Sequence, residues 1–289
     1  MMATHAALAA RTTTIRSALT AARATLISSE SVDLDAQALL TQALQVERAF
    51  LFAHGEYELD EAQIRAFQSM IKRRAAGEPI AYIIGKKGFY DLGLHVTPAV
   101  LIPRPETELL LEEALHLTAS MTAGALADIG TGSGALAIAL ARQRLQCTVY
   151  ATDISADALD IAGQNAESHD ADVAFFRGNL AQPLIDRGIK ADLLVANLPY
   201  IATDELRSLP VSRWEPRQAL DGGGDGLDLI RALLAQLPKV INPSAQVLLE
   251  IGADQGQAVT QLVHDRFHID TAVLPDYAGL DRIVTFRFG

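Results

Sequence analysis

The tetrapeptide Asn197-Leu198-Pro199-Tyr200 contains the residue types that point most clearly to chemistry. It follows an apolar run, residues 191–196, that has the composition of a buried strand. At the end of such a strand Asn197 can present its side-chain oxygen and Tyr200 a flat ring. Proline disfavours a helical conformation of the residue before it, so the main-chain carbonyl of Leu198 should lie in an extended segment.

This combination of groups suits a reaction at the nitrogen of a planar carboxamide. An amide nitrogen is a poor nucleophile because its lone pair is delocalised into the carbonyl. Two oxygen acceptors that bind both N–H hydrogens keep the nitrogen facing an electrophile as it pyramidalises, and an aromatic ring can stack on the amide plane. If the electrophile is strong, catalysis is mainly alignment in a dry pocket, and no general base is needed. The other interpretation of Asn-x-Pro-Tyr is a turn that merely ends a strand.

A glycine-rich loop upstream is expected to bind a cofactor. Its sequence, Ala-Asp-Ile-Gly-Thr-Gly-Ser-Gly at residues 127–134, ends a predicted strand and opens a predicted helix. Glycine permits positive φ and lets a ligand approach the main chain closely, while the helix N-terminus offers free N–H groups. The residues expected to contact the cofactor are Asp128, Gly130, Thr131, Gly132, Ser133, Gly134, Asp153, Asn179, Leu180 and Asn197.

Two cofactors fit the loop by itself. Gly130, Gly132 and Ala135 match the loose G-x-G-x-x-A pattern of dinucleotide sites, so the loop admits NAD as well as S-adenosylmethionine. Asp128 favours S-adenosylmethionine, because a carboxylate repels a pyrophosphate but attracts a sulfonium and an ammonium group. The carboxamide chemistry predicted for Asn197 favours the same cofactor.

The remaining cofactor contacts are expected after the next two strands. Asp153 ends the second strand at the distance of a ribose-binding acid, and its two oxygens can accept from both ribose hydroxyls. After the third strand, Asn179 would offer polar contacts to the adenine and Leu180 an apolar wall.

The elements that must position these residues alternate between strand and helix from Arg104 onward. Strands separated by helices need crossover connections, so we expect an α/β fold with a Rossmann-like, mostly parallel sheet. Only a short turn, 277–281, separates the last two strands, so the last strand should be antiparallel. Pro105, with Glu106 and Glu108 after it, is typical of a helix start. The expected strands are 125–129, 148–152, 173–176, 193–196, 247–251, 271–274 and 283–288, and the expected helices are 106–120, 134–144, 155–168, 226–238 and 254–266.

The first eighty residues have helical apolar spacing instead, with Asp60 as a candidate cap and Gly77 and Pro79 as a stop. Residues 80–100 then alternate with a period of two, which predicts a β-hairpin that includes Ile80, Tyr82 and Ile84. We therefore predict a small helical N-terminal domain, a linking β-hairpin and an α/β C-terminal domain, at 1–78, 79–103 and 104–289.

Composition excludes several classes of protein and partner. A net charge of −11 with only two short basic clusters makes DNA or RNA a poor fit as sole substrate, so no direct nucleic-acid contact is expected. The single cysteine, Cys147, allows no internal disulfide or thiolate zinc site, and the seven histidines lack ligand spacing, so no metal is expected. Without a membrane-spanning run or a secretory signal, the expectation is a cytoplasmic protein, and we expect a monomer.

Further motifs accompany the glycine loop and residues 197–200. They are Gly77-Glu78-Pro79, Leu101-Ile102-Pro103-Arg104-Pro105-Glu106-Thr107-Glu108, Trp214-Glu215-Pro216, Asp225-Gly226-Leu227, and Asp276-Tyr277 with Arg282. On these motifs the chain resembles the HemK/PrmC family, the release factor glutamine methyltransferases, over nearly its whole length.

The resemblance implies a reaction and a partner. The reaction is methyl transfer from S-adenosylmethionine to N5 of the glutamine in the Gly-Gly-Gln loop of class 1 peptide-chain release factors. The helical domain would recognise the release factor as its substrate, and the C-terminal domain would bind the cofactor. The resemblance also implies that Phe89 lines the pocket near the transferred methyl. The substrate-binding residues would then be Phe89, Asn197, Leu198, Pro199 and Tyr200, of which the last four are the predicted catalytic group.

The chain departs from the family pattern at three positions. Leu198 replaces a proline, Asn179 an aspartate, and Gly88 an acid. None of these changes removes a required group. Three alternative functions stay open: glutamine methylation of a ribosomal protein, adenine-N6 methylation of nucleic acid, and a catalytically silent cofactor-binding module. The acidic balance argues against the second, and the intact Asn197 against the third.

Overall fold

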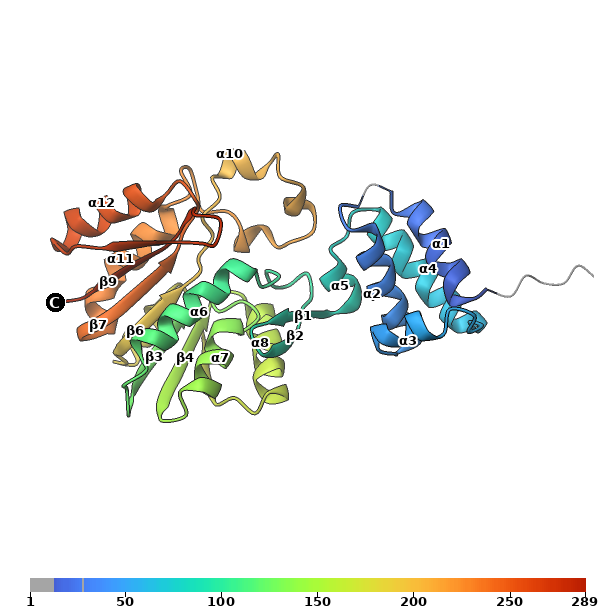
Figure 1. The fold of residues 1–289 in the computed structure, drawn as a ribbon. Helices are drawn as coiled ribbons and strands as arrows, with labels where there is room; N and C mark the ends of the chain where they lie inside the picture. Colours follow the sequence, from blue (N-terminus) through green and yellow to red (C-terminus); the bar gives the residue numbers. More distant parts are fainter. Residues whose placement is uncertain (1–12, 28) are drawn as a thin grey trace, which may run out of the picture. The chain divides into compact units, whose positions relative to one another are not determined.

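The structure is a computed structural model that describes residues 13–27 and 29–289. It divides after Ile84 into two compact units, of which the second is Gly85–Gly289 (Figure 1). Residues 1–12 of the helical domain predicted at 1–78 lie outside the described residues. The hairpin predicted as a separate linker belongs to the second unit.

The N-terminal unit is helical, as the apolar spacing predicts. Thr14 and Ser17 form a capping box at its first helix, and Asp60 and Gln63 form another at its fourth. Leucine and isoleucine side chains from these helices pack into one buried cluster. The helices are α1 (Ile15–Thr25), α2 (Val32–Leu44), α3 (Arg48–Ala53), α4 (Glu61–Ala75) and α5 (Ile80–Ile84).

The prediction that residues 80–84 form a strand is wrong, because this segment is the helix α5. The carbonyl of Pro79 accepts hydrogen bonds from the N–H groups of Tyr82 and Ile83, as in a first helical turn. Ile80, Ile83 and Ile84 pack against the helical core, and their i, i+3, i+4 spacing also fits a helix. The hairpin is consequently shorter than predicted, with strands β1 (Lys86–Phe89) and β2 (Leu92–His95).

The C-terminal unit is built on a sheet of strand order β5-β4-β3-β6-β7-β9-β8. Strands β3 to β7 are parallel, and β9 is antiparallel to both of its neighbours. This arrangement confirms the predicted mostly parallel sheet with an antiparallel last strand. The strands are β3 (Gly124–Ile129), β4 (Cys147–Asp153), β5 (Val173–Arg177), β6 (Ala191–Ala196), β7 (Ile241–Glu250), β8 (Ala272–Pro275) and β9 (Asp281–Arg287).

Helices cover both faces of this sheet (Figure 1). Side chains alternate between the faces along each strand, so Leu194 and Ala196 join one buried cluster while Leu193 and Val195 join another. The first cluster includes residues of α9, α11 and α12, and the second includes residues of α6, α7 and α8. These helices, with the short α10, are α6 (Pro105–Leu117), α7 (Ala135–Gln143), α8 (Ala156–Ser168), α9 (Gln182–Asp186), α10 (Thr203–Leu206), α11 (Asp228–Val240) and α12 (Gly256–Phe267).

The helix α6 begins as its sequence predicts. Pro105 occupies the first turn, Arg104 is the N-cap residue, and Glu106 and Glu108 lie at the positive end of the helix dipole. Glu108 also accepts a hydrogen bond from the main-chain N–H of Tyr90, at 3.0 Å, which ties α6 to the tip of the hairpin.

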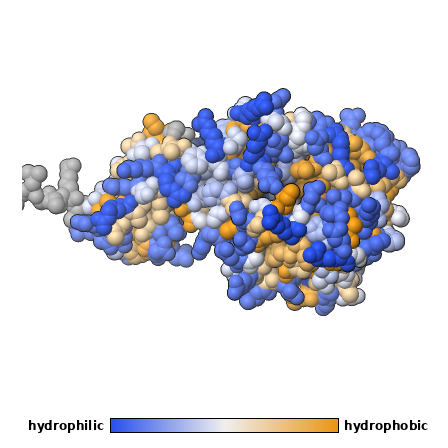
Figure 2. Space-filling view, turned by 180° about the vertical axis from the view of Figure 1, so that it is seen from behind, coloured by the Kyte–Doolittle hydropathy of each residue, from blue (hydrophilic) through white to orange (hydrophobic). Residues whose placement is uncertain are grey.

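Hydrophilic and hydrophobic residues are interspersed on the face of the molecule shown in Figure 2. Among residues 13–27 and 29–289, no helix is both long enough and apolar enough to span a bilayer.

Gly134 is predicted to be essential for the packing of α7. It caps this helix with a φ of +84°, and a Cβ there would lie 2.8 Å from Ile138 Cδ1 and 3.2 Å from Ala162 Cβ. Gly134→Ala should therefore lower the free energy of unfolding, measured by urea denaturation, by about 1–3 kcal/mol. Gly163→Ala is the control. Gly163 lies inside α8. Apart from its chain neighbours and the main chain of its own helix, no heavy atom of the described residues lies within 4 Å of a Cβ built on it.

The control variant should be as stable as the parent chain or more stable by about 0.5–1 kcal/mol. A Gly134→Ala protein that unfolds at the same urea concentration as Gly163→Ala would contradict the packing argument.

Candidate active site

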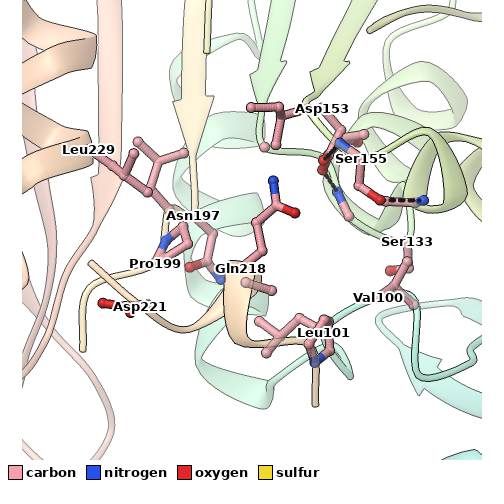
Figure 3. Close-up of a pocket in the computed structure, with 18 of the residues that line it drawn as sticks. Val100, Leu101, Ser133, Asp153, Ser155, Asn197, Pro199, Gln218, Asp221 and Leu229 are labelled. Carbon is pink, nitrogen blue, oxygen red and sulfur yellow. Dashed lines mark hydrogen bonds between the residues drawn. The ribbon is translucent and has the colours of Figure 1, made fainter. Parts of the chain in front are cut away.

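A cavity of about 820 Å³ opens where β3, β4 and β6 end, a volume suited to a small-molecule ligand (Figure 3). The strand order reverses beside β3, and in open α/β sheets ligands bind outside the carboxyl ends of strands at such a point. Most of the predicted site residues line the cavity: Asp128, Gly130, Thr131, Gly132, Ser133, Asp153, Asn179, Leu180, Asn197, Leu198 and Pro199.

The glycine loop is shaped by hydrogen bonds to β4. The N–H groups of Gly130 and Thr131 both donate to the carbonyl of Thr152, each at 2.9 Å. Gly130 and Gly132 have φ values of +79° and +55°, which favour glycine. Apart from Gly132 and its two chain neighbours, no heavy atom of the described residues lies within 4 Å of a Cβ built on Gly132. The main chain at Gly132 is therefore open to a ligand.

Asp153 is fixed in place by main-chain donors. Its Oδ2 accepts from the N–H of Gly132 and its Oδ1 from the N–H of Ser155, each at 2.9 Å. Each carboxylate oxygen keeps a further lone pair, so both can still accept a hydrogen bond from a ligand hydroxyl. In Figure 3, Asp153 and Ser155 lie on one side of the cavity, and Asn197 lies on the other.

Asp128 is a nearly fully buried acid at the entrance of the loop. Its Oδ2 accepts from Thr131 Oγ1 at 2.7 Å and from the N–H of Ala137 at 3.2 Å. Burial raises the pKa of Asp128 to about 7, although these two hydrogen bonds act to lower it. A cation bound in the cavity next to this carboxyl would favour its ionised form.

The main chain after β5 supplies another part of the wall. Leu180 has a φ of +52°, an uncommon conformation for a bulky residue. Its neighbour Ala181 donates its N–H to Gln236 Oε1 at 2.7 Å, which anchors this turn on α11. Asn179 and Leu180 are thereby held at the cavity.

Asn197 is oriented by a hydrogen bond that the sequence did not reveal. Its Nδ2 donates to the hydroxyl oxygen of Thr107, in the first turn of α6, at 2.9 Å. Because the amide nitrogen is used in this way, Oδ1 is the group left to act as an acceptor at the cavity. Thr107 lies inside the Pro105–Glu108 motif, which the sequence marked only as a helix start.

Three predicted site residues lie outside the cavity wall. Phe89, predicted to line the pocket, is 1% exposed and packs in the hydrophobic core, because it occupies an inward position of β1. Gly134, predicted to contact the cofactor, is instead the N-cap residue of α7, and a Cβ built on it would point toward Ile138 and Ala162.

Tyr200 is the third of these residues. Its carbonyl accepts from Gln255 Nε2 at 2.9 Å, and its phenol lies near the charges of Glu250 and Arg282. Burial raises the pKa of Tyr200 to about 12. The predicted stacking of its ring on a substrate amide is thus not supported by its position.

Two loops that line the cavity were missed as site elements. They contain residues 99–104 and 216–219, and the sequence marked their motifs without giving them a role. Glu215 connects the loops, because its buried carboxylate pairs with the guanidinium of Arg104 and accepts from the N–H of Ile102. The described part of the chain holds no group of three or more His, Cys, Asp or Glu side chains that could bind a metal ion.

The residues present fit S-adenosylmethionine. The open main chain at Gly132, the free lone pairs of Asp153 and the acid Asp128 correspond to the contacts that its amino acid, ribose and sulfonium groups require. The sheet order with a reversed β9 is that of Rossmann-like methyltransferases. The fold and the site thus define an S-adenosylmethionine-dependent methyltransferase.

Comparisons with known proteins define the family. Residues 17–85 match the PrmC N-terminal domain, and residues 105–213 match the methyltransferase small domain. The chain is 45% identical over 256 residues to the release factor glutamine methyltransferase of Xylella fastidiosa, with 88% of this chain and 92% of that protein covered. It is 46% identical over 253 residues to the protein of the same name from Moorella thermoacetica, with coverages of 86% and 89%. The chain therefore belongs to the release factor glutamine methyltransferase family.

A solved structure supports the fold. The methyltransferase from Pyrococcus furiosus has a TM-score of 0.51 to this chain at 17% identity, with 77% of this chain and 98% of that one covered. The predicted resemblance, the enzyme class and S-adenosylmethionine as the cofactor, in place of NAD, are confirmed.

The raised pKa of Asp128 predicts pH-dependent binding of the cofactor. S-adenosylmethionine should favour the ionised carboxyl, so its affinity should rise with pH until Asp128 is ionised, near pH 7. The dissociation constant, measured by isothermal titration calorimetry, should fall by about tenfold from pH 6 to pH 8. Asp128→Asn should bind more weakly and lose this dependence.

Asp192→Asn is the matched control, because Asp192 bonds to Ala125 and Asn242 away from the cavity. It should keep the pH dependence. An Asp128→Asn protein whose affinity still follows pH would show that another group is responsible.

Proposed function

We propose that this chain transfers a methyl group from S-adenosylmethionine to the side-chain amide N5 of the glutamine in the Gly-Gly-Gln motif of class 1 peptide-chain release factors. The observation that carries the proposal is the hydrogen bond from Asn197 Nδ2 to Thr107 Oγ1, at 2.9 Å. It leaves Asn197 Oδ1 as an acceptor for one N–H of a carboxamide. The names of the relatives from Xylella fastidiosa and Moorella thermoacetica support the same substrate.

Residues 130–133 and Asp153 would hold the cofactor on one side of the cavity. The main chain at Gly132 and the carboxylate of Asp153 would bind its polar groups, and Asp128 would face its positive charge. Asn179 and Leu180 would enclose the adenine. When bound, S-adenosylmethionine supplies a methyl group on a sulfonium, which is already a strong electrophile.

Asn197 and Leu198 would hold the acceptor amide. The Oδ1 of Asn197 binds one amide hydrogen, and the carbonyl of Leu198, followed by Pro199, binds the other. The nitrogen then faces the methyl group as it becomes pyramidal, so alignment replaces general-base catalysis. The proton leaves the nitrogen after the transfer.

Leucine at position 198 is compatible with this role. Its side chain is 4% exposed and lies in the core, with Cδ2 only 3.0 Å from a Cβ built on Gly130. This packing fixes residue 198 against the glycine loop, a constraint that the ring of a proline provides in the family pattern. The main-chain carbonyl, which is the group required, is unaffected by the exchange.

We also propose that the helical unit, which ends at Ile84, recognises the release factor. Its match to the PrmC N-terminal domain, a part of known release factor methyltransferases, supports this role. The net charge of −11 supports action on a protein without direct contact to nucleic acid. We further propose that the enzyme is a monomer and that it acts in the cytoplasm, where release factors work.

The substrate can be tested by methyl labelling. The purified chain with tritiated S-adenosylmethionine should label an unmodified class 1 release factor, and a Gln→Ala change in the Gly-Gly-Gln loop of that factor should abolish the label. Ribosomal proteins and total RNA serve as competing acceptors in parallel reactions. Label that persists on the altered factor, or that enters only ribosomal protein or RNA, overturns the assignment.

The role of Asn197 can be tested by substitution. Asn197→Ala should lower kcat for the release factor by about 10²-fold, the usual effect of removing one positioned hydrogen-bonding group from an active site. Asn242→Ala is the control, because Asn242 bonds to Asp192 at the opposite end of β6. It should retain the kcat of the parent chain. Equal kcat values for the two variants would refute the proposed role of Asn197.

A further inference from the structure

Glu250, the last residue of β7, is a buried acid to which the reaction above assigns no role. Glu250 is only 1% exposed. In the described part of the chain, Oε2 has no hydrogen-bond partner. Burying a carboxyl group with an unsatisfied oxygen costs free energy, so stability of the fold does not account for Glu250.

The contacts of Glu250 lead directly to Asn197. Its carboxyl group lies within hydrogen-bonding reach of the side chains of Thr107 and Asn197, and both act to lower its pKa. The hydroxyl oxygen of Thr107 already accepts from Asn197 Nδ2, so the hydroxyl proton of Thr107 is the one available to Glu250. The three side chains thus form a buried cluster at the acceptor site, in which the carboxyl of Glu250 can act on Asn197 directly and through the hydroxyl of Thr107.

We propose that Glu250 is a positioning residue of the acceptor site: acting directly and through Thr107, its carboxylate fixes the carboxamide of Asn197 with Oδ1 toward the cavity and strengthens Oδ1 as an acceptor. This inference rests on the proposed role of Asn197 in binding the substrate amide. Glu250 itself touches neither the substrate nor the cofactor in this scheme.

The direction of the effect follows from charge. An ionised acceptor makes a stronger hydrogen bond than a neutral one, and bonds in a chain polarise one another in a buried site. Negative charge on Glu250 draws the proton of Thr107, which makes Thr107 Oγ1 a better acceptor for Asn197 Nδ2 and places more electron density on Oδ1. The amide hydrogens of the substrate become more positive as the nitrogen is methylated, so the stronger acceptor favours the transition state over the ground state.

Glu250 has the surroundings of a group that titrates near neutral pH. Burial raises its pKa to about 7, while Thr107, Asn197 and the guanidinium of Arg282 on β9 act to lower it. Glu106, on α6, raises it, and the phenol of Tyr200 lies close enough to be affected by the same carboxylate. At saturating cofactor, kcat should therefore increase as pH rises through about 7, because Glu250 becomes ionised.

The test compares Glu250→Gln with the parent chain across pH 6 to 9, with kcat measured on the release factor at saturating S-adenosylmethionine. Saturation removes the separate effect of Asp128 on cofactor binding. Glu250→Gln keeps the shape and an acceptor oxygen but never ionises. Its kcat at pH 8 should be about tenfold lower, its KM for the release factor unchanged, and its rise in kcat near pH 7 absent.

Thr107→Val gives an independent arm, because it removes the connecting hydroxyl and leaves Glu250 in place. This variant should show a smaller rise in kcat near pH 7, because only the direct contact between Glu250 and Asn197 remains. Thr107→Ser, which restores the hydroxyl, should recover most of the lost kcat. A Glu250→Gln or Thr107→Val protein that keeps the parent kcat and pH profile overturns the inference. A loss that appears in KM and cofactor affinity, with the pH profile retained, also overturns it, since that pattern indicates general damage to the fold.

Asn197→Ala separates this inference from the function on which it rests. If Asn197→Ala is inactive while Glu250→Gln and Thr107→Val behave as the parent chain, only the role of Glu250 fails. If Asn197→Ala retains the parent kcat, the proposed function of the acceptor site fails, and the inference fails with it.

Discussion

The orientation of a single carboxamide is the constraint on which the site depends. The oxygen and nitrogen of an asparagine side chain are similar in size, so packing alone does not decide which one faces a ligand. In this chain the choice is made by chemistry, because Asn197 Nδ2 has an acceptor in Thr107 Oγ1 at 2.9 Å. A hydroxyl at the start of α6 thereby converts an ambiguous side chain into a defined hydrogen-bond acceptor.

The sheet brings the two halves of the site together through its register. Ile129 pairs with Thr152 on one side and with Ala196 on the other, so three strands end at the same level. The glycine loop, Asp153 and Asn197, far apart in sequence, consequently leave the sheet side by side. The strand order reverses beside β3, which leaves this edge free of a crossover helix and open to a ligand.

Sequence reasoning succeeded where local patterns and backbone geometry decide the outcome. The alternation of strands and helices, the start of α6 at Pro105 and the glycine loop are of this kind. It failed where long-range packing decides. Phe89 could have faced a ligand or the core, and only the assembled sheet places it in the core. Thr107 and Asn197 are 90 residues apart in the sequence, so no local pattern predicts the hydrogen bond between them.

Two buried acids do not favour the stability of the fold but can serve the reaction. Asp128 and Glu250 end or nearly end strands β3 and β7, and burial raises the pKa of each to about 7. In the unfolded chain both carboxyl groups lose their proton above their ordinary pKa near 4, whereas in the folded protein they keep it up to about pH 7. Their contribution to the free energy of unfolding is therefore fully present in acid and is lost as pH rises through 7. A fold under selection for stability alone would place apolar residues there. The presence of these two buried acids is explained if their negative charge is used, that of Asp128 beside a cationic cofactor and that of Glu250 behind the amide of Asn197.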